Sequence, residues 1–367
     1  MGRSIVENQS NLIPESKTSP AKRGFLSRLL YIYRPRTWKE KGALWTLGVV
    51  LATYVVIVVI LGIYWSWEPD FFDVRTSVLE KAGNDEKKLV PGFATTATAI
   101  RIAETLLHKP GGYLSNDVTP PGIYLDNMPA WEFGVLTELR DTANAMRNHF
   151  SRSRTQSIEN KDLQQVESSF NFDPKSWILP STESQYENGI QALYLYLQQL
   201  ADEKAQDQQF FTRADNLTIY LNLAAQRLGS LAQRLAASVG QERVDINLAG
   251  DPKAPQSTPT SGQQRVRTAW LEIDNVFYEA RGYTWALTNM LKAISIDFEN
   301  VLKDKNVQSL MEQTIRELEG ANSGMWIPMV LNGTGFGLLA NHSLVMASYI
   351  SRANAGLIDI VKLLATN

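Results

Sequence analysis

The stretch Gly42-Ala-Leu-Trp-Thr-Leu-Gly-Val-Val-Leu-Ala-Thr-Tyr-Val-Val-Ile-Val-Val-Ile-Leu-Gly-Ile-Tyr-Trp-Ser-Trp67 runs for 26 residues without a charged side chain. A helix needs about 20 apolar residues to cross the hydrocarbon core of a bilayer, so residues 42–67 are predicted to span one. A buried helix of a soluble protein is the first alternative, but such a helix normally keeps a polar face. A cleaved signal peptide is the second, but its apolar region is only about 7–15 residues long. We therefore expect an uncleaved signal anchor that contacts the lipid bilayer.

The charges on either side of this stretch orient the predicted anchor. Nine Lys or Arg and three Glu precede Gly42, whereas Glu68, Asp70 and Asp73 follow Trp67 closely. Basic flanks stay on the cytoplasmic side, which predicts a cytoplasmic N-terminus and a periplasmic C-terminal domain behind a single pass of the bacterial inner membrane. The basic tail, residues 1–41, is expected to be partly disordered. Within it, residues 24–34 fit an amphipathic helix on the inner leaflet and an unstructured basic stop sequence equally well.

Charge and cysteine content narrow the chemistry of the rest of the chain. Removing the charges before Gly42 from the totals of 36 basic and 38 acidic residues leaves 27 and 35, a net charge of −8. An acidic domain is a poor partner for nucleic acid, which binds basic surfaces. The chain has no Cys, which excludes disulfides, thiolate metal sites and a cysteine nucleophile. About three hundred residues can bury an ample core without disulfides.

The part of the chain after the anchor has the spacing of helices. Apolar residues recur at steps of three and four in five segments, which begin near residues 136, 186, 217, 287 and 346. This spacing predicts helices with one buried face, and strict alternation is too scarce for more than a short hairpin. A capping box at Thr182-x-x-Gln185 predicts a helix start, and Gly240 predicts a helix end. The fold class expected is all-α, a transmembrane helix followed by a multi-helix bundle.

The expected organisation after the anchor has four parts. They are a juxtamembrane connector (68–89), a first helical part (90–240), a polar loop rich in Pro, Ser and Thr (241–267), and a second helical part (268–367). The two helical parts are expected to share one domain, because the second has only about a hundred residues. The heptad-like rhythm also suits a coiled coil between chains, but its short runs favour packing within one chain. Association of this chain into a homo-oligomer is therefore kept as an alternative.

Several motifs together identify a family resemblance. They include Glu68-Pro69-Asp70-x-Phe72-Asp73-Val74, Pro110-Gly111-Gly112-Tyr113 and Leu331-Asn332-Gly333-Thr334-Gly335-Phe336-Gly337. The chain resembles a family of proteobacterial inner-membrane proteins known as domain of unknown function 2333, over nearly its whole length from the anchor onward. The resemblance implies a Gram-negative host. It implies no activity, and no functional residue can be carried over from it.

Local motifs for catalysis, cofactors or metals are missing from the sequence. The three His residues are scattered, and neither a Gly-x-Ser-x-Gly elbow nor a Walker lysine motif occurs. The glycine-rich residues 333–337 fit a tight turn better than a phosphate cradle, which needs a preceding strand. Glu183-Ser184 matches a pair found in lytic transglycosylases, but Glu is also favoured in the first turn of any helix. We therefore predict no catalytic residue, cofactor site or metal site from the sequence.

The best polar cluster lies in the Pro- and Gly-rich region between residues 110 and 132. Its members are Asn116, Asp117, Asp126, Asn127, Trp131 and Glu132. Loops of this kind often carry function. Asn and Asp residues also cap helices and close turns, which is the interpretation we favour. The function expected is that of a membrane-anchored binding or scaffold protein with an unidentified envelope protein as its partner. The alternative is an envelope enzyme that acts on murein, glycan or lipid through carboxylates brought together by the fold.

Overall fold

The computed structural model describes residues 33–152, 159–202, 209–244, 263–325, 329–334 and 338–366. Residues 1–59 and residues 60–367 form two compact units. Two predictions concern segments outside the described residues. They are those for the N-terminal residues 1–32, including the amphipathic stretch, and for most of the loop 241–267. The boundaries proposed for the parts of the chain stay predictions.

The first unit consists of a short helix and most of a long apolar one. Helix α2 (Pro35–Lys41) ends at Gly42, which has a φ of +88° and separates α2 from α3 (Ala43–Trp65). Positive φ is the region that Gly adopts without strain, so the chain can change direction at this residue. No residue of α3 is buried. Most of the apolar side chains of this helix are exposed, and Trp65 in its last turn packs against the hydrophobic core of the second unit.

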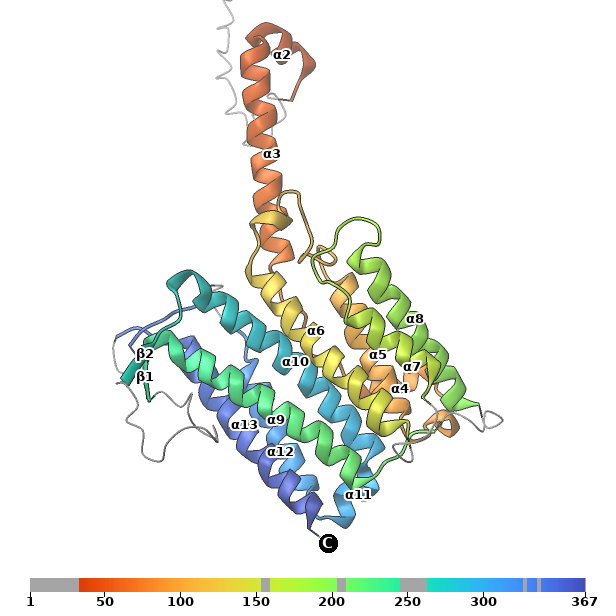
Figure 1. The fold of residues 1–367 in the computed structure, drawn as a ribbon. Coiled ribbons are helices and arrows are strands. Elements are labelled where there is room, and N and C mark those ends of the chain that lie inside the picture. Colours follow the sequence, from red (N-terminus) through yellow and green to blue (C-terminus); the bar gives the residue numbers. More distant parts are fainter. Residues whose placement is uncertain are drawn as a thin grey trace, which may run out of the picture. The chain divides into compact units, whose positions relative to one another are not determined.

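The second unit, called the helical unit below, is built almost entirely of helices (Figure 1). Its long helices are α5 (Phe93–His108), α6 (Asn127–Ala145), α8 (Thr182–Ala201), α9 (Ala214–Ala236), α10 (Ile273–Asp297), α12 (Gln308–Ala321) and α13 (His342–Ala365). Shorter helices are α4 (Val74–Lys81), α7 (Lys161–Phe170) and α11 (Glu299–Asp304). Single turns are η1 (Glu86–Lys88), η2 (Gly122–Tyr124), η3 (Met146–Phe150), η4 (Ala237–Val239) and η5 (Trp270–Glu272). Strands β1 (Gln241–Val244) and β2 (Gln263–Val266) pair antiparallel. The prediction of an all-α fold with at most a short hairpin is confirmed.

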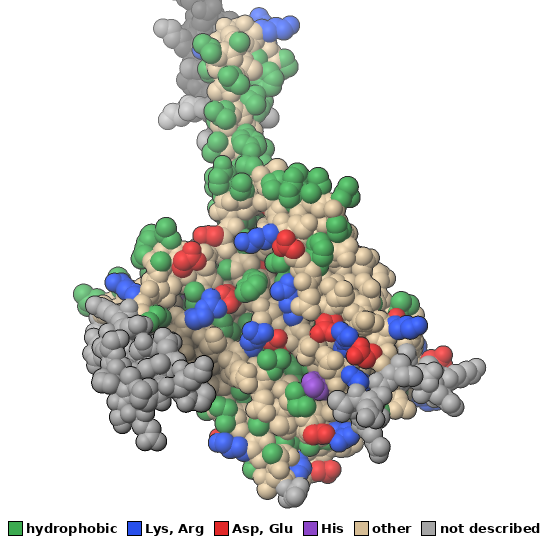
Figure 2. Space-filling model, viewed as in Figure 1, with side chains coloured by type: hydrophobic (Ala, Val, Ile, Leu, Met, Phe, Trp, Pro, Cys, Tyr) green, Lys and Arg blue, Asp and Glu red, His purple; other side chains and the backbone are tan. Residues whose placement is uncertain are grey.

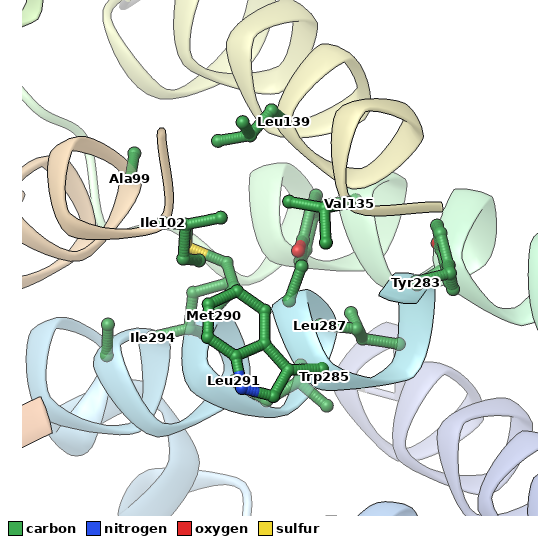
Figure 3. Packing of buried hydrophobic residues seen from close by; sticks show 14 of the residues in the cluster. Ala99, Ile102, Val135, Leu139, Tyr283, Trp285, Leu287, Met290, Leu291 and Ile294 are labelled. Carbon is green, nitrogen blue, oxygen red and sulfur yellow. The ribbon is translucent and has the colours of Figure 1, made fainter. Parts of the chain in front are cut away.

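The central pair of the helical unit is α6 and α10. Helices α5, α7 and α8 pack together on one side of this pair, and α9, α12 and α13 on the other. One hydrophobic cluster runs through both groups, so helices from before and after the polar loop share a core. Figure 3 shows Ile102 of α5, Val135 of α6 and Leu287 of α10 meeting in it.

Side-chain caps set the start of several helices. Asp126 caps α6 by accepting a hydrogen bond from the backbone N–H of Asn127, and Asn341 caps α13 through Leu344. Helix α8 begins one residue earlier than its predicted capping box, because Ser181 accepts from the N–H of Ser184 at 3.3 Å. The predicted cap at Thr182 is corrected: the Thr182 hydroxyl instead donates to the carbonyls of Asp173 and Ser176.

One cap comes from a distant part of the chain. The Asp297 carboxylate, at the end of α10, accepts from the Thr95 N–H at 2.7 Å and the Thr95 hydroxyl at 2.6 Å in the first turn of α5. Burial raises the pKa of Asp297 to about 6, and these hydrogen bonds oppose the shift. The contact satisfies otherwise unpaired donors at the helix N-terminus.

Among the described residues, two helices are long and apolar enough to cross a membrane, α3 and α13. Helix α13 packs against α9 and α12 and buries a face that includes Ile350, Leu357 and Ile360. This burial explains why α13 is apolar: it is a helix of the protein core. Helix α3 has no buried residue, and its membrane crossing remains a prediction.

Helices α6 and α10 approach each other closely at two glycines. A Cβ on Gly282 would lie 1.9 Å from the carbonyl oxygen of Trp131, and a Cβ on Gly134 would lie 2.1 Å from that of Glu279. Real Cβ atoms do not approach backbone this closely, so only Gly lets the two backbones meet. The crossing thus depends on Gly at both positions.

We expect Gly282→Ala to destabilise the helical unit by roughly 1–3 kcal/mol, because the added methyl forces α6 and α10 apart. Urea unfolding of the detergent-solubilised protein measures this. Gly229→Ala, in α9, is the matched control: its Cβ would meet only Asn354 Nδ2, at 3.5 Å. That change should be neutral or stabilising by about 0.5–1 kcal/mol. Equal effects of the two changes would contradict the close approach.

Candidate functional site

A buried ion pair holds the loop in which the sequence placed its polar cluster. The Lys109 ammonium at the end of α5 donates to the Glu132 carboxylate of α6 and to the carbonyl of Gly112. Glu132 also accepts from the N–H groups of Leu114 and Ser115, both at 2.8 Å. The two charged side chains are 1 % and 0 % exposed. Burial lowers the pKa of Lys109, and the charge of Glu132 opposes that shift.

Three of the six predicted site residues lie inside the protein. Glu132 forms the ion pair above, and Trp131 is fully buried against Trp285, with ring centroids 5.3 Å apart. Asn116 is buried and donates to the carbonyl of Ser176 at 2.9 Å and to Glu183 at 3.0 Å. The expectation that these three residues form a partner surface is corrected. Their side chains serve packing and hydrogen bonding.

The other three predicted residues reach solvent to different degrees. Asp126 is exposed and caps α6, as the favoured interpretation of the sequence expected. Asn127, the first residue of α6, is half-buried. Asp117 lies over Gly122, and partial burial raises its pKa, aided by the nearby charges of Glu132 and Glu183. A role of these three residues in binding a partner stays a prediction.

A pocket of about 590 Å³ lies between the segment after α3 and helix α10, and it was not foreseen from the sequence. Residues 66–71, which follow α3, form one wall, and Tyr278, Arg281 and Trp285 of α10 form another. Arg281 donates through Nε to both carboxylate oxygens of Glu68, at 2.8 and 2.7 Å, and through Nη1 to the carbonyl of Ser323. Burial raises the pKa of Glu68, opposed by Arg281. The pocket thus combines aromatic side chains with a paired charge, which suits a ligand with apolar and polar parts.

A second cluster of polar side chains joins α6 to α9 and α10, and it contains two carboxylates of α6. Glu138 is fully buried and accepts from the hydroxyls of Tyr220 at 2.5 Å and Thr142 at 2.9 Å. Asp141, one turn further along α6, accepts two hydrogen bonds from Arg227, at 2.9 and 3.0 Å. Burial raises the pKa of Glu138 to about 8, which keeps this acid neutral at pH 7. A pocket of about 220 Å³ opens beside the cluster and is lined partly by Arg227 and Tyr283.

These pairings have almost no signal in the sequence. Glu68 and Arg281 are 213 residues apart, and Glu138 and Tyr220 are 82 apart. The one available hint was Glu138 itself, a charged residue two positions after Leu136 and one before Leu139, both of which belong to the apolar face. Within the parts of the chain that the structure describes, no group of three or more His, Asp or Glu side chains is arranged to hold a metal ion.

Comparison with known families gives a match over residues 38–367, to the family DUF2333, described as uncharacterized protein conserved in bacteria. The chain belongs to this family. The resemblance inferred from the sequence motifs is confirmed, and the family's description adds no reaction, ligand or compartment. The comparisons with curated proteins and with solved structures gave no match.

We expect Glu132→Gln to destabilise the protein by roughly 3–5 kcal/mol, because it leaves the Lys109 charge buried without its partner. Asp126→Ala, in the same loop region, should cost only about 1 kcal/mol, the usual value of a helix N-cap. Urea unfolding of the two variants measures the difference. A Glu132→Gln variant no less stable than Asp126→Ala would show that the ion pair does not hold the loop.

Glu138 should make the protein less stable as the pH rises. The pKa of this residue is about 8 in the folded protein, against the ordinary value of 4.5 for a glutamic acid. The unfolded chain therefore releases its proton first, and stability falls between these two values by up to about 1.4 kcal/mol per pH unit. Glu138→Gln, which cannot ionise, should flatten this dependence in unfolding measured from pH 5 to pH 8. Glu86→Gln at an exposed site is the control, and a Glu138→Gln profile that matched it would contradict the assignment.

Proposed function

We propose that this protein is a membrane-anchored binding protein of the bacterial cell envelope. In this proposal α3 crosses the inner membrane once, the N-terminus is cytoplasmic, and the helical unit lies in the periplasm, where it binds an envelope protein. Membership of a family conserved in bacteria supports the bacterial setting. The charge asymmetry around residues 42–67 supports the orientation.

The observation that carries the proposal is the surface of α3. Its 23 residues include no charged side chain, and none is buried by protein. A helix that is apolar all round must be covered, and a lipid bilayer covers a helix of this length.

The binding role rests on the helical unit next to this helix. The pocket between residues 66–71 and α10 offers Trp285 and Tyr278 beside the Arg281–Glu68 pair. Asp117, Asp126 and Asn127 lie in the neighbouring loop region at positions that a partner can reach. Such convergent aromatic and polar groups in a concavity are typical of binding sites.

An envelope enzyme that acts on murein, glycan or lipid is the second candidate, and Glu138 and Asp141 favour it. Arg227, which pairs with Asp141, and Tyr283, which lies beside Glu138, both line a pocket, and the raised pKa of Glu138 favours the protonated form that a general acid needs. This candidate requires the purified protein to cleave such a substrate and Glu138→Gln to abolish cleavage while the protein remains folded.

The anchor proposal predicts that a reporter active only in the periplasm works when fused after Asn367. The same reporter placed before Met1 should be inactive, which controls for leakage. Photo-crosslinkers at Asp126 and Asn127 should then capture one defined envelope protein in native membranes, and a crosslinker at the exposed Lys303 of α11 should not. Activity of only a cytoplasmic reporter after Asn367 would overturn the topology. Equal capture at all three sites would overturn the binding surface.

A further inference from the structure

One end of the helical unit carries a group of exposed apolar side chains from four separate segments. They are Trp67 after α3, residues 123–124 of η2, residues 177–179 before α8, and residues 270–271 of η5, together called the apolar rim. Their exposed fractions run from 55 % for Ile123 to 94 % for Leu179. Among the described residues of this unit, the exposed tryptophans are Trp67, Trp177 and Trp270, and all three belong to the rim.

Contacts within the helical unit place the four segments at the same end. The ring of Trp65, in the last turn of α3, lies against Gly111, and Gly62 lies against Pro121, next to η2. Asn116 joins this loop to the segment before α8 through its hydrogen bond to the Ser176 carbonyl. The start of α10 lies at the same end, because α10 crosses α6 at Gly282 and Trp131 and begins at the same end as α6.

The figures agree with these contacts. Figure 1 shows that α6, α8 and α10 all begin at one end of the unit. Figure 2 shows hydrophobic side chains gathered around that end, with most of the charged side chains further away from it.

Exposure on this scale calls for a covering surface. Moving apolar side chains out of water is favourable. Single exposed apolar residues need no explanation, whereas grouped ones mark an interface. Tryptophan and tyrosine are the residues enriched where a membrane protein meets the lipid headgroups, because each has an apolar body and a polar tip.

We propose that the apolar rim lies on the lipid bilayer, in the headgroup region of the leaflet from which α3 emerges. This inference rests on the proposed insertion of α3. Residues 60–65 of that helix are part of the helical unit and pack at the rim through Gly62 and Trp65, without an intervening linker. A bilayer that receives α3 is therefore the surface nearest to the rim, and the exposed tryptophans match its interface.

The absence of Cys from the chain makes single-site labelling direct. Ile178→Cys and Leu271→Cys place a nitroxide at two rim segments that are far apart in sequence. Leu363→Cys, near the end of α13, is the matched control, since Leu363 is also an exposed leucine, with 45 % of its surface accessible. The full-length variants are reconstituted in phosphatidylethanolamine and phosphatidylglycerol vesicles, and circular dichroism checks their fold.

Collision with oxygen, which concentrates in lipid, is then compared with collision with a water-soluble nickel complex. The rim labels should favour oxygen and the label at position 363 should favour nickel. Rim labels as open to nickel as the control would overturn the inference. So would rim labels that are shielded from both reagents and broadened by a second spin, because that result indicates a second copy. Protein that fails to float with the vesicles would instead defeat the insertion of α3, so the two failures can be told apart.

Discussion

The structure depends on the backbone-to-backbone crossing of α6 and α10. Gly134 and Gly282 let the two helices meet without side chains between them. The residues around the crossing then reach their partners: Trp131 packs on Trp285, and Tyr283 lies beside the buried cluster of Glu138. Because the interior is close-packed, moving one of these helices would disturb all of these contacts together.

Buried ionisable side chains lie around this crossing at three places. Lys109–Glu132 secures the loop before α6, Arg281–Glu68 secures the segment after α3, and Glu138 is held between tyrosines in the neutral form. Buried ion pairs contribute little net stability but are costly to break, so they specify one arrangement of the loops. In this protein the segment after α3 lines the pocket, and the loop before α6 carries two residues of the rim.

The pocket and the rim share Trp67 and lie at one end of the helical unit. A rim that rests on the bilayer would bring this pocket to the level of the lipid headgroups. The Glu138 cluster lies further along α6, beside a separate pocket. The two candidate functions therefore use different parts of the same unit, and their tests do not interfere.

The sequence alone determined the features that depend on local order along the chain. The uncharged run 42–67 and the steps of three and four were enough to identify an apolar helix and a helical fold, and the motifs were enough to identify the family. Helix periodicity and caps such as Asp126 arise from neighbours a few residues away, which a sequence displays directly.

Only the tertiary structure decided which polar residues face inward. Glu132 and Asn116 looked like surface residues because their partners, Lys109, Ser176 and Glu183, lie 23, 60 and 67 positions away. The Arg281–Glu68 pair, the Asp297 cap and the grouping of the rim were hidden for the same reason: each joins segments whose proximity is set by helix packing.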